Sequence, residues 1–323
     1  MHERRRKPAV LLTALLLWAG VVMSDAAAAE SAGSARGAAV SDASPRGVSV
    51  SDASAPDPSV PQDSEYVFTT FHYDSETDLH IYRSADALNF EAPAAPAYTP
   101  TNSLLRDPSI IRHRDGRFYV VHTTGWDTTN FAIAVSSDLR SWQHLTTVEV
   151  PVAGTNNTWA PEFFVDPVDG SVSVIVSLAA EYRTAFRPYV FTALDSSLRR
   201  WSSPAAMAGI APNYIDTFVV YHQGEYHAFT KNETDKRIEH AVSPRLAGPY
   251  EFVQTGDFAG WGRAEGPAIT TLPDGRYRIY MDAYTSDRFL YSDSSDLYEW
   301  TAPRELPGGL SGFVRHGTIL RLN

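Results

Sequence analysis

The chain has 323 residues, a formal charge of −11 and no cysteine, so disulfide bonds are excluded. With 43% hydrophobic residues it can bury a large core, which excludes an intrinsically disordered protein. The excess of acidic side chains repels phosphate backbones and anionic lipids, so we expect neither a nucleic-acid nor a membrane partner.

Residues 1–29 have the pattern of a secretory signal peptide. A basic start at Arg4 to Lys7 precedes the apolar stretch 8–23, and Ala27 to Ala29 form a small-residue cleavage site. An uncleaved membrane anchor is the alternative, but an apolar stretch of about 16 residues is shorter than the roughly 20 that a spanning helix needs. We therefore expect a secreted protein, extracellular or periplasmic.

Residues 30–63 are dominated by Ala, Ser, Gly, Pro and Asp. Such a stretch has too little apolar surface to offset the entropy of ordering, so it is predicted to be a disordered spacer. Residues 64–323 then form a single folded domain.

A sequence motif recurs along this domain at intervals of 49 to 59 residues. Each copy is a polar turn that closes on an aromatic residue, at Phe90, Trp142, Trp201, Tyr250 and Trp300. Regular repeats of this length in a strand-rich chain indicate the blades of a β-propeller, and five repeats predict five blades.

Between the motifs lie strand signals that follow Gly-containing turns. They are rich in β-branched and aromatic residues and cover 116–123, 171–178, 224–230 and 275–281. Together with the flanking segments they predict an all-β fold in which each blade is a four-stranded antiparallel meander.

The first repeat lacks an innermost strand, whereas the last segment, residues 312–322, is a single strand with no blade of its own. We expect this C-terminal strand to pair with the N-terminal blade and close the ring, because a propeller leaves no open edge.

A second series, of titratable residues, runs in step with the motif. Each begins a short apolar strand, and neighbouring members lie 49 to 55 residues apart: Asp107, Glu162, Asp216, Glu265 and His316. Each could be a turn residue that faces water, but a matched series before buried strands favours convergence on a central channel. We expect every blade to supply one such group at the same structural position.

Two carboxyl groups on opposite sides of a polar funnel can hydrolyse a glycosidic bond. One protonates the leaving oxygen and the other activates water, while a third carboxylate can raise the pKa of the acid. The chain contains no Gly-x-Ser-x-Gly, His-Glu-x-x-His or Walker-type motif that would favour another chemistry.

Four ordered motifs resemble glycoside hydrolase family 43, the five-bladed inverting arabinosidases and xylosidases. They are Arg106-Asp107-Pro-Ser, Trp159-Ala-Pro-Glu162, Tyr214-Ile-Asp216 and Glu265-Gly-Pro. The resemblance implies that Asp107 is the general base, Glu265 the general acid, and Asp216 the group that modulates the pKa of the acid and orients it. It also implies that Glu162 lies in the sugar-binding pocket, and that the chemistry needs no cofactor.

His316 matches the family histidine that faces the centre of the channel, where many members hold a calcium ion or an ordered water. One imidazole would need waters to complete a calcium shell of six to eight oxygens. The alternative is a histidine that is simply hydrogen-bonded in a packed channel.

Aromatic residues near the expected channel mouth are candidates to stack on sugar rings, and one arginine could bind hydroxyls: Trp126, Trp159, Tyr214, Trp261 and Arg288. Trp142, Trp201 and Trp300 end the repeated motif and are expected to be wedges between blades instead.

These patterns predict a monomeric enzyme that releases arabinofuranose from a plant-type polysaccharide or oligosaccharide. A β-xyloside or a β-galactofuranoside is the alternative substrate, and a non-catalytic sugar-binding propeller is the alternative class of protein. Related retaining furanosidases combine an Asn-Asp-Pro nucleophile with a Glu-Cys acid; both are missing from the sequence, which favours inversion.

Overall fold

The computed structural model describes residues 65–210 and 212–322, so the predicted signal peptide and spacer lie outside the described residues. The described chain is almost entirely β, with one short 3-10 turn, η1 (Tyr284–Ser286). Its strands are β1 (Tyr66–His72), β2 (Ser75–Ser84), β3 (Arg106–Arg112), β4 (Phe118–Thr123), β5 (Asn130–Ser136), β6 (Trp142–Glu149), β7 (Asn157–Val165), β8 (Val172–Ala179), β9 (Arg187–Thr192), β10 (Ala205–Ala206), β11 (Tyr214–His222), β12 (Glu225–Asn232), β13 (Arg237–Ser243), β14 (Glu251–Gln254), β15 (Glu265–Thr271), β16 (Tyr277–Ala283), β17 (Arg288–Ser294), β18 (Arg304–Glu305) and β19 (Val314–Arg321).

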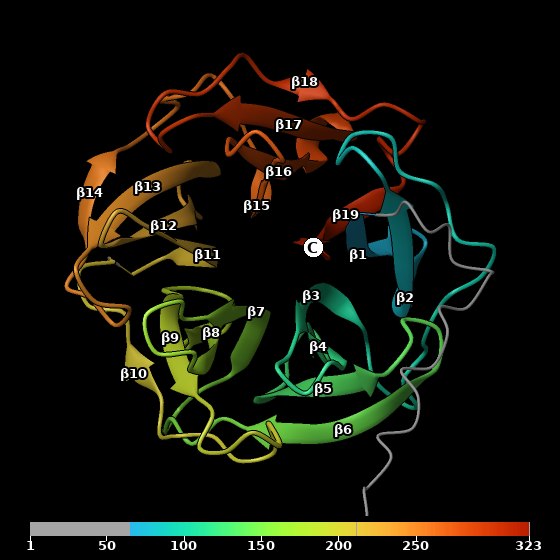
Figure 1. Cartoon of the computed structure of the whole chain (residues 1–323). Helices are drawn as coiled ribbons and strands as arrows, with labels where there is room; N and C mark the ends of the chain where they lie inside the picture. The colour runs from blue at the N-terminus through green and yellow to red at the C-terminus, as the bar shows by residue number, and fades with distance from the viewer. Residues whose placement is uncertain (1–64, 211, 323) are drawn as a thin grey trace, which may run out of the picture. The chain divides into compact units, whose positions relative to one another are not determined.

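The strands form five antiparallel sheets arranged around one axis, so the predicted five-bladed propeller is confirmed (Figure 1). Four blades are four-stranded meanders that begin with the innermost strand: β3–β6, β7–β10, β11–β14 and β15–β18. The fifth has the order β19-β1-β2.

The ring closes where the two ends of the described chain meet. Strand β19 pairs antiparallel with β1, from Tyr66 opposite Arg321 to His72 opposite Val314, as the sequence predicted. The outer edge of this blade is made by two isolated bridges, Leu79 to Tyr98 and Arg83 to Glu91, in place of a fourth strand.

The repeated motif is a hydrogen-bonded turn at the outer edge of a blade. In the copy at 136–142, Ser136 Oγ donates to Asp138, and the same carboxylate accepts the main-chain N–H of Arg140 at 2.8 Å. The residue after the aspartate, Leu139, has φ of 63° and is buried. The motif therefore reverses the chain and inserts one apolar side chain into the core.

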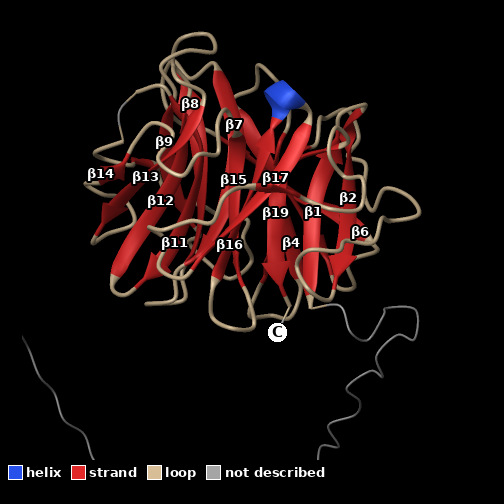
Figure 2. Ribbon diagram, turned by 90° about the horizontal axis from the view of Figure 1, so that it is seen from above, coloured by secondary structure: helices blue, strands red, loops and turns tan. Residues whose placement is uncertain are grey.

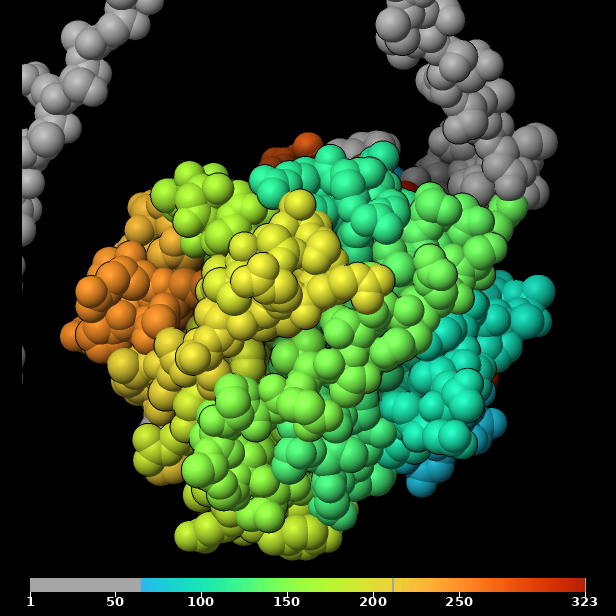
Figure 3. Space-filling model, turned by 90° about the horizontal axis from the view of Figure 1, so that it is seen from below, coloured from blue at the N-terminus to red at the C-terminus, as the bar shows by residue number. Residues whose placement is uncertain are grey.

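Each of the five blade interfaces has a large apolar cluster that holds the ring together. The tryptophans predicted to be wedges join these clusters: Trp201 packs edge-on against Phe131 of the preceding blade, and Trp300 against Phe229. Figure 3 shows one flank, where the yellow segment around residue 200 lies beside green β6, and Arg199 donates to the carbonyl of Leu145 at 2.5 Å.

All five innermost strands begin at the same face of the ring. Figure 2 shows η1 at this face and the end of β19 at the opposite one. Side chains at the strand starts are thus gathered at one mouth of the channel. Within residues 65–210 and 212–322, no helix has the length and apolar character of a membrane span.

Candidate active site

A bulge interrupts the start of four innermost strands and decides which side chains face the channel mouth. In each, the regular register fails over two residues, and the first of these two has a positive φ: 51° at Asp107, 47° at Ala160, 54° at Asp216 and 58° at Gly266. Asp107 and Asp216 are therefore equivalent, whereas Glu265 stands one residue before the bulge and Glu162 two residues after Ala160. The prediction that all the titratable groups share one structural position is wrong.

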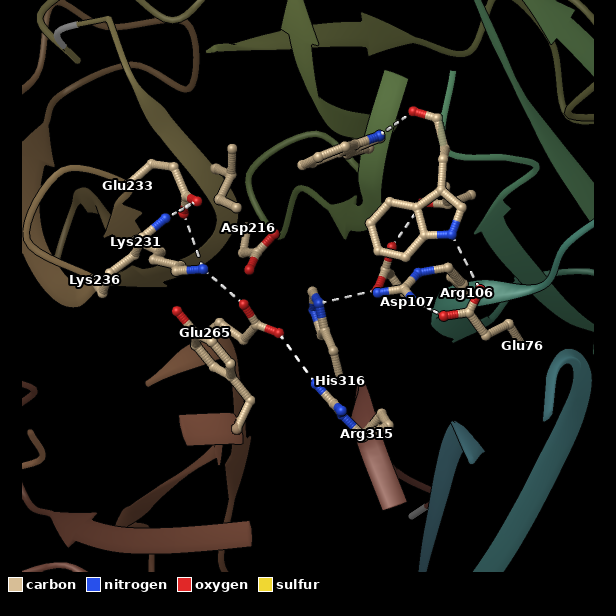
Figure 4. A pocket seen from close by; sticks show the side chains of 15 residues that line it. Glu76, Arg106, Asp107, Asp216, Lys231, Glu233, Lys236, Glu265, Arg315 and His316 are labelled. Atoms are coloured by element: carbon tan, nitrogen blue, oxygen red, sulfur yellow. Dashed lines mark hydrogen bonds and ion pairs between the residues drawn. The ribbon is translucent and has the colours of Figure 1, made fainter. Parts of the chain in front are cut away.

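A cavity of about 410 Å³ opens at this mouth (Figure 4). Residues from all five blades line it: Glu76, Arg106, Asp107, Thr123, Trp126, Trp159, Ile215, Asp216, Lys231, Glu233, Lys236, Glu265, Tyr284, Arg315 and His316. The three predicted catalytic carboxylates are all among them. In Figure 4, His316 lies between Asp107 on one side and Asp216 and Glu265 on the other.

The carboxylate of Asp107 is held from two sides. Thr123 Oγ1 donates to its Oδ2 at 2.8 Å, and His316 Nδ1 lies 3.5 Å from its Oδ1. Thr123 Oγ1 also accepts the main-chain N–H of Ala160 at 2.9 Å, which ties Asp107 to the next blade. The carboxylate is buried yet borders the cavity, so its orientation is fixed before a ligand enters.

Asp216 links the two blades beside its own. Its main-chain N–H donates to Ser177 Oγ at 3.2 Å, and its Oδ2 accepts the N–H of Gly266, the residue after Glu265, at 3.2 Å. Burial raises the pKa of Asp216 to about 6, against the opposing charges of His316 and Lys231. This carboxyl therefore changes its charge in the mildly acidic range.

Glu265 is held by two cations. Lys231 Nζ donates to Oε2 at 2.6 Å, and Arg315 lies 3.6 Å from Oε1. Lys231 is buried and also contacts Glu233 at 2.9 Å; burial lowers its pKa, but the nearby carboxylates, Glu265 first, outweigh burial and raise it. Arg315 is anchored in turn by Asp282, which accepts from Nε at 2.6 Å.

His316 is buried at the centre of these carboxylates. Burial opposes its imidazolium, but the surrounding negative charges, Asp216 foremost, outweigh burial and raise the pKa of His316. Among the described residues, no three His, Asp or Glu side chains lie close enough to hold a metal ion together. The Nδ1 atom of the imidazole faces Asp107 at 3.5 Å, and calcium bound to His316 through waters stays a prediction.

Glu162 does not line the cavity. Its place two residues beyond the bulge position puts it deeper along β7, where Ser109 Oγ donates at 2.6 Å and Thr318 Oγ1 at 3.1 Å. Burial raises the pKa of Glu162 to about 7, although these hydroxyls and His316 favour the charged form. The structure therefore does not place this side chain at the cavity that the three catalytic carboxylates share.

Two of the predicted aromatic residues form one wall. Trp126 and Trp159 lie edge to face with centroids 5.6 Å apart, and Trp159 Nε1 donates to the carbonyl of Trp126 at 2.8 Å. Arg106 stacks on the Trp126 ring at 4.0 Å and pairs with Glu76, which also accepts from Trp126 Nε1 at 3.1 Å.

Three predicted site residues lie elsewhere. Tyr214 points away from the cavity because side chains alternate along a strand and its neighbour Ile215 lines it; its hydroxyl donates to Glu239 at 2.6 Å. Trp261 is buried in an interface cluster, where it packs on Trp300 at 5.3 Å. Arg288 begins β17 and is exposed outside the cavity.

Sequence reasoning missed most of the cationic side of the cavity. Lys231 pairs directly opposite Ile215, so the register of the β11–β12 hairpin could have revealed it. Arg315 stands next to His316 and could have been inferred from that position. Glu76, in the first hairpin, and Tyr284, in η1, carry no local signal that distinguishes them from ordinary surface residues.

Known protein families and structures resemble this chain in sequence pattern and in fold. A domain model related to glycosyl hydrolase family 43, described as a probable glycosyl hydrolase domain, matches residues 62–323. A search of curated protein sequences finds no significant match.

Solved structures share the fold at low sequence identity. A thermostable family-43 glycoside hydrolase is 15% identical with a TM-score of 0.59, covering 76% of this chain and 92% of its own. An endo-1,4-β-xylanase from Bacteroides thetaiotaomicron is 13% identical with a TM-score of 0.57, over 80% of this chain and 94% of its own. An α-L-arabinanase from Cellvibrio cellulosa in complex with arabinohexaose is 16% identical with a TM-score of 0.53, over 73% and 91%.

Proposed function

We propose that this chain, which belongs to the glycosyl hydrolases related to family 43, cleaves arabinofuranosyl linkages in plant-type polysaccharides or oligosaccharides with inversion. Asp107, Asp216 and Glu265, which lie 158 residues apart from first to last, face a single cavity from strands β3, β11 and β15. A matched pair of carboxyls around a sugar-sized cavity is the arrangement that glycoside hydrolysis requires.

Asp107 is proposed as the general base. It accepts a hydrogen bond from Thr123 and contacts His316, which fixes its orientation while one edge borders the cavity. A water between Asp107 and the anomeric carbon gives its proton to the carboxylate as its oxygen attacks.

Glu265 is proposed as the general acid, on the other side of His316. As the bond from the anomeric carbon to the leaving oxygen breaks, the protonated carboxyl transfers its proton to that oxygen. Lys231 and Arg315 hold the two carboxyl oxygens, so the group enters the reaction from one position. Asp216, hydrogen-bonded to the N–H that follows Glu265, is proposed to orient the acid and to modulate its pKa.

The sugar ring is proposed to stack on the wall made by Trp126 and Trp159, since the apolar face of a sugar packs well on an aromatic ring. Xylosides and galactofuranosides are the alternatives, because the same acids would serve them. Some structural neighbours are called an endo-xylanase and a β-1,3-galactosidase, so β-galactopyranosides also belong in a test.

The test is a panel of nitrophenyl glycosides: α-L-arabinofuranoside, β-D-xyloside, β-D-galactofuranoside and β-D-galactopyranoside. We expect the arabinofuranoside to be hydrolysed fastest, and NMR of the first product to show the inverted anomer. If another glycoside of the panel is hydrolysed fastest, its sugar takes the place of arabinofuranose as the proposed substrate. A first product of retained configuration would rule out the inverting mechanism.

The roles of the acids are tested by Asp107→Ala and Glu265→Ala. Each variant should lower kcat by about 10³-fold or more, because acid and base catalysis typically contribute 10²–10⁴ each. Glu251→Ala, an exposed glutamate on β14, is the matched control and should keep full activity. If either variant keeps activity near that of the wild type, the residue is not the proposed catalytic acid or base. A wild-type protein that binds arabinan but hydrolyses no glycoside would favour a non-catalytic binding protein.

The proposed place of action is outside the cell, as a monomer. The basic start, the apolar stretch and the Ala27 to Ala29 site support cleavage and export. Amino-terminal sequencing of the protein recovered from culture medium or periplasm should begin near residue 30. Recovery of the intact chain from the cytoplasm alone would contradict export.

A further inference from the structure

We infer that a second cavity, apart from the catalytic one, binds an uncharged carbohydrate segment; this inference rests on the proposed function. The cavity measures about 650 Å³ and lies between the segment 98–103 and the blade strands β4, β5 and β6. Its lining consists of Tyr98, Thr99, Pro100, Thr101, Asn102, Ser103, His122, Thr124, Thr128, Asn130, Ala132, His144 and Thr147.

The chemistry of this lining differs from that of the catalytic cavity. Nine of the fifteen residues around the catalytic cavity are Asp, Glu, Lys or Arg, whereas none of the thirteen residues around the second cavity is. Hydroxyl, amide and imidazole groups dominate, with one tyrosine ring to offer an apolar face. Such a surface, with hydroxyl and amide groups and no Asp, Glu, Lys or Arg, suits a neutral polyhydroxylated ligand.

Several of these polar groups are already oriented. Thr124 Oγ1 donates to Asn130 Oδ1 at 2.7 Å and lies 3.0 Å from Thr128 Oγ1, so the three side chains form one network. His122 is buried, and its Nδ1 donates to the carbonyl of Thr123 at 3.0 Å. Its Nε2 is then an acceptor, and it has no hydrogen-bond partner in the described structure.

The two cavities share one loop. The turn between β4 and β5 supplies Trp126 to the catalytic cavity and both Thr124 and Thr128 to the second one. Figure 3 shows the flank concerned, where the teal residues around position 100 lie beside green residues that follow them in the chain. A polymer bound in the second cavity is therefore held next to the catalytic mouth. Because the second lining has no carboxylate, it binds without cleaving.

The critical variant is Thr147→Trp. Thr147 is exposed on β6 opposite Ala132, so an indole there fills the cavity from its open side without disturbing the core. Gln143→Trp is the matched control, because Gln143 is exposed on the same strand and does not line the cavity. Tyr98→Ala is a second probe, since the bridge between Tyr98 and Leu79 is made by main-chain atoms and survives the change.

Binding is measured by affinity electrophoresis in gels that contain soluble arabinan, arabinoxylan or galactan. All variants carry Asp107→Asn, so that the polymer is not consumed and the catalytic cavity contributes equally. For at least one polymer, we expect Thr147→Trp and Tyr98→Ala to raise the Kd derived from retardation about tenfold. Gln143→Trp should leave this Kd unchanged. Equal retardation of all variants, or no retardation of the parent by any polymer, would overturn the inference.

A separate readout distinguishes this inference from the proposed function. With Asp107 intact, Thr147→Trp should hydrolyse the nitrophenyl glycoside at the parental rate and lose efficiency only on polymer. If the parent hydrolyses no glycoside, the proposed function fails. If glycoside hydrolysis is normal and the polymer rate of Thr147→Trp is also normal, only the second site fails.

Discussion

His316 is one of three basic residues, with Lys231 and Arg315, that offset the negative charge at the channel mouth. Several carboxyls surround it, and in a buried site such like charges destabilise one another unless a cation or protons offset them. A positively charged His316 lowers this repulsion and orients Asp107 through the contact at 3.5 Å. The raised pKa of His316 favours the imidazolium, and Lys231 and Arg315 also bring positive charge to the carboxylates.

Glu162 is the residue through which pH should act on stability. Its pKa is about 7 in the folded protein and 4.5 in the unfolded chain, so between these values the folded state binds a proton that the unfolded state does not. Stability therefore falls as pH rises from 4.5 to 7. Glu162→Gln keeps the hydroxyl contacts without the charge, so we expect the fall in Tm from pH 5 to pH 8 to be smaller by about 3 °C or more.

Thermal unfolding at several pH values, with wild type and Glu162→Gln side by side, measures this difference. Glu251→Gln, at an exposed site, should follow the wild type. Parallel curves for Glu162→Gln and wild type would mean that Glu162 is ionised in the folded state throughout.

The bulges of the inner strands are the elements that sequence reasoning could not resolve. The spacing of the repeated aromatic motif predicted the blades correctly. The matching spacing of the acids predicted the innermost strands. It could not show that Glu162 stands two residues past its bulge position, since an extra residue in a strand leaves no mark in the period. For the same reason Tyr214, adjacent to the site in sequence, could not be assigned to the blade interface without knowing which of its neighbours faces the channel.

Gly266 tests the role of these bulges. Its φ is 58°, and a Cβ there would lie 2.5 to 2.9 Å from three atoms of His316. Gly266→Ala should therefore displace the histidine and the adjacent Glu265, and we expect kcat to fall by about 10²-fold, since small misplacements of catalytic groups have effects of this size.

The matched control is Gly275→Ala in the same blade. Gly275 also has a positive φ, 85°, but a Cβ there meets nothing within 4 Å. It should lose only about 1 kcal/mol of stability and keep full activity. If Gly266→Ala and Gly275→Ala have similar kcat values, a Cβ beside His316 does not disturb the catalytic residues.

At the scale of the whole molecule, the ring depends on five similar interfaces rather than on one central core. Each interface has its own apolar cluster, and the channel between the inner strands is polar. The interface beside the closing blade includes Val314 and Ile319 of β19. Loss of a single interface therefore opens the circle.

Deletion of residues 312–323 should prevent folding. The deletion removes β19, exposes the edge of β1 and takes Val314 and Ile319 from the interface cluster. We expect insoluble protein, or a soluble form that binds a hydrophobic dye and melts without cooperativity. Gly317→Ala is a milder version, because its Cβ would collide with the main chain of Thr69. A truncated protein with a cooperative melt would contradict closure by β19.

The main-chain N–H of Leu322 donates to the carbonyl of Glu65 at 2.7 Å, so the two ends of the described chain are neighbours on the face away from the catalytic mouth. A short Gly/Ser linker from 322 to 65 would make the polypeptide circular, and new termini could be opened in an exposed turn such as the one around Asp274 and Gly275. The acids would then occur in a different order along the sequence and still meet around the same axis, with the closing blade built from one uninterrupted stretch.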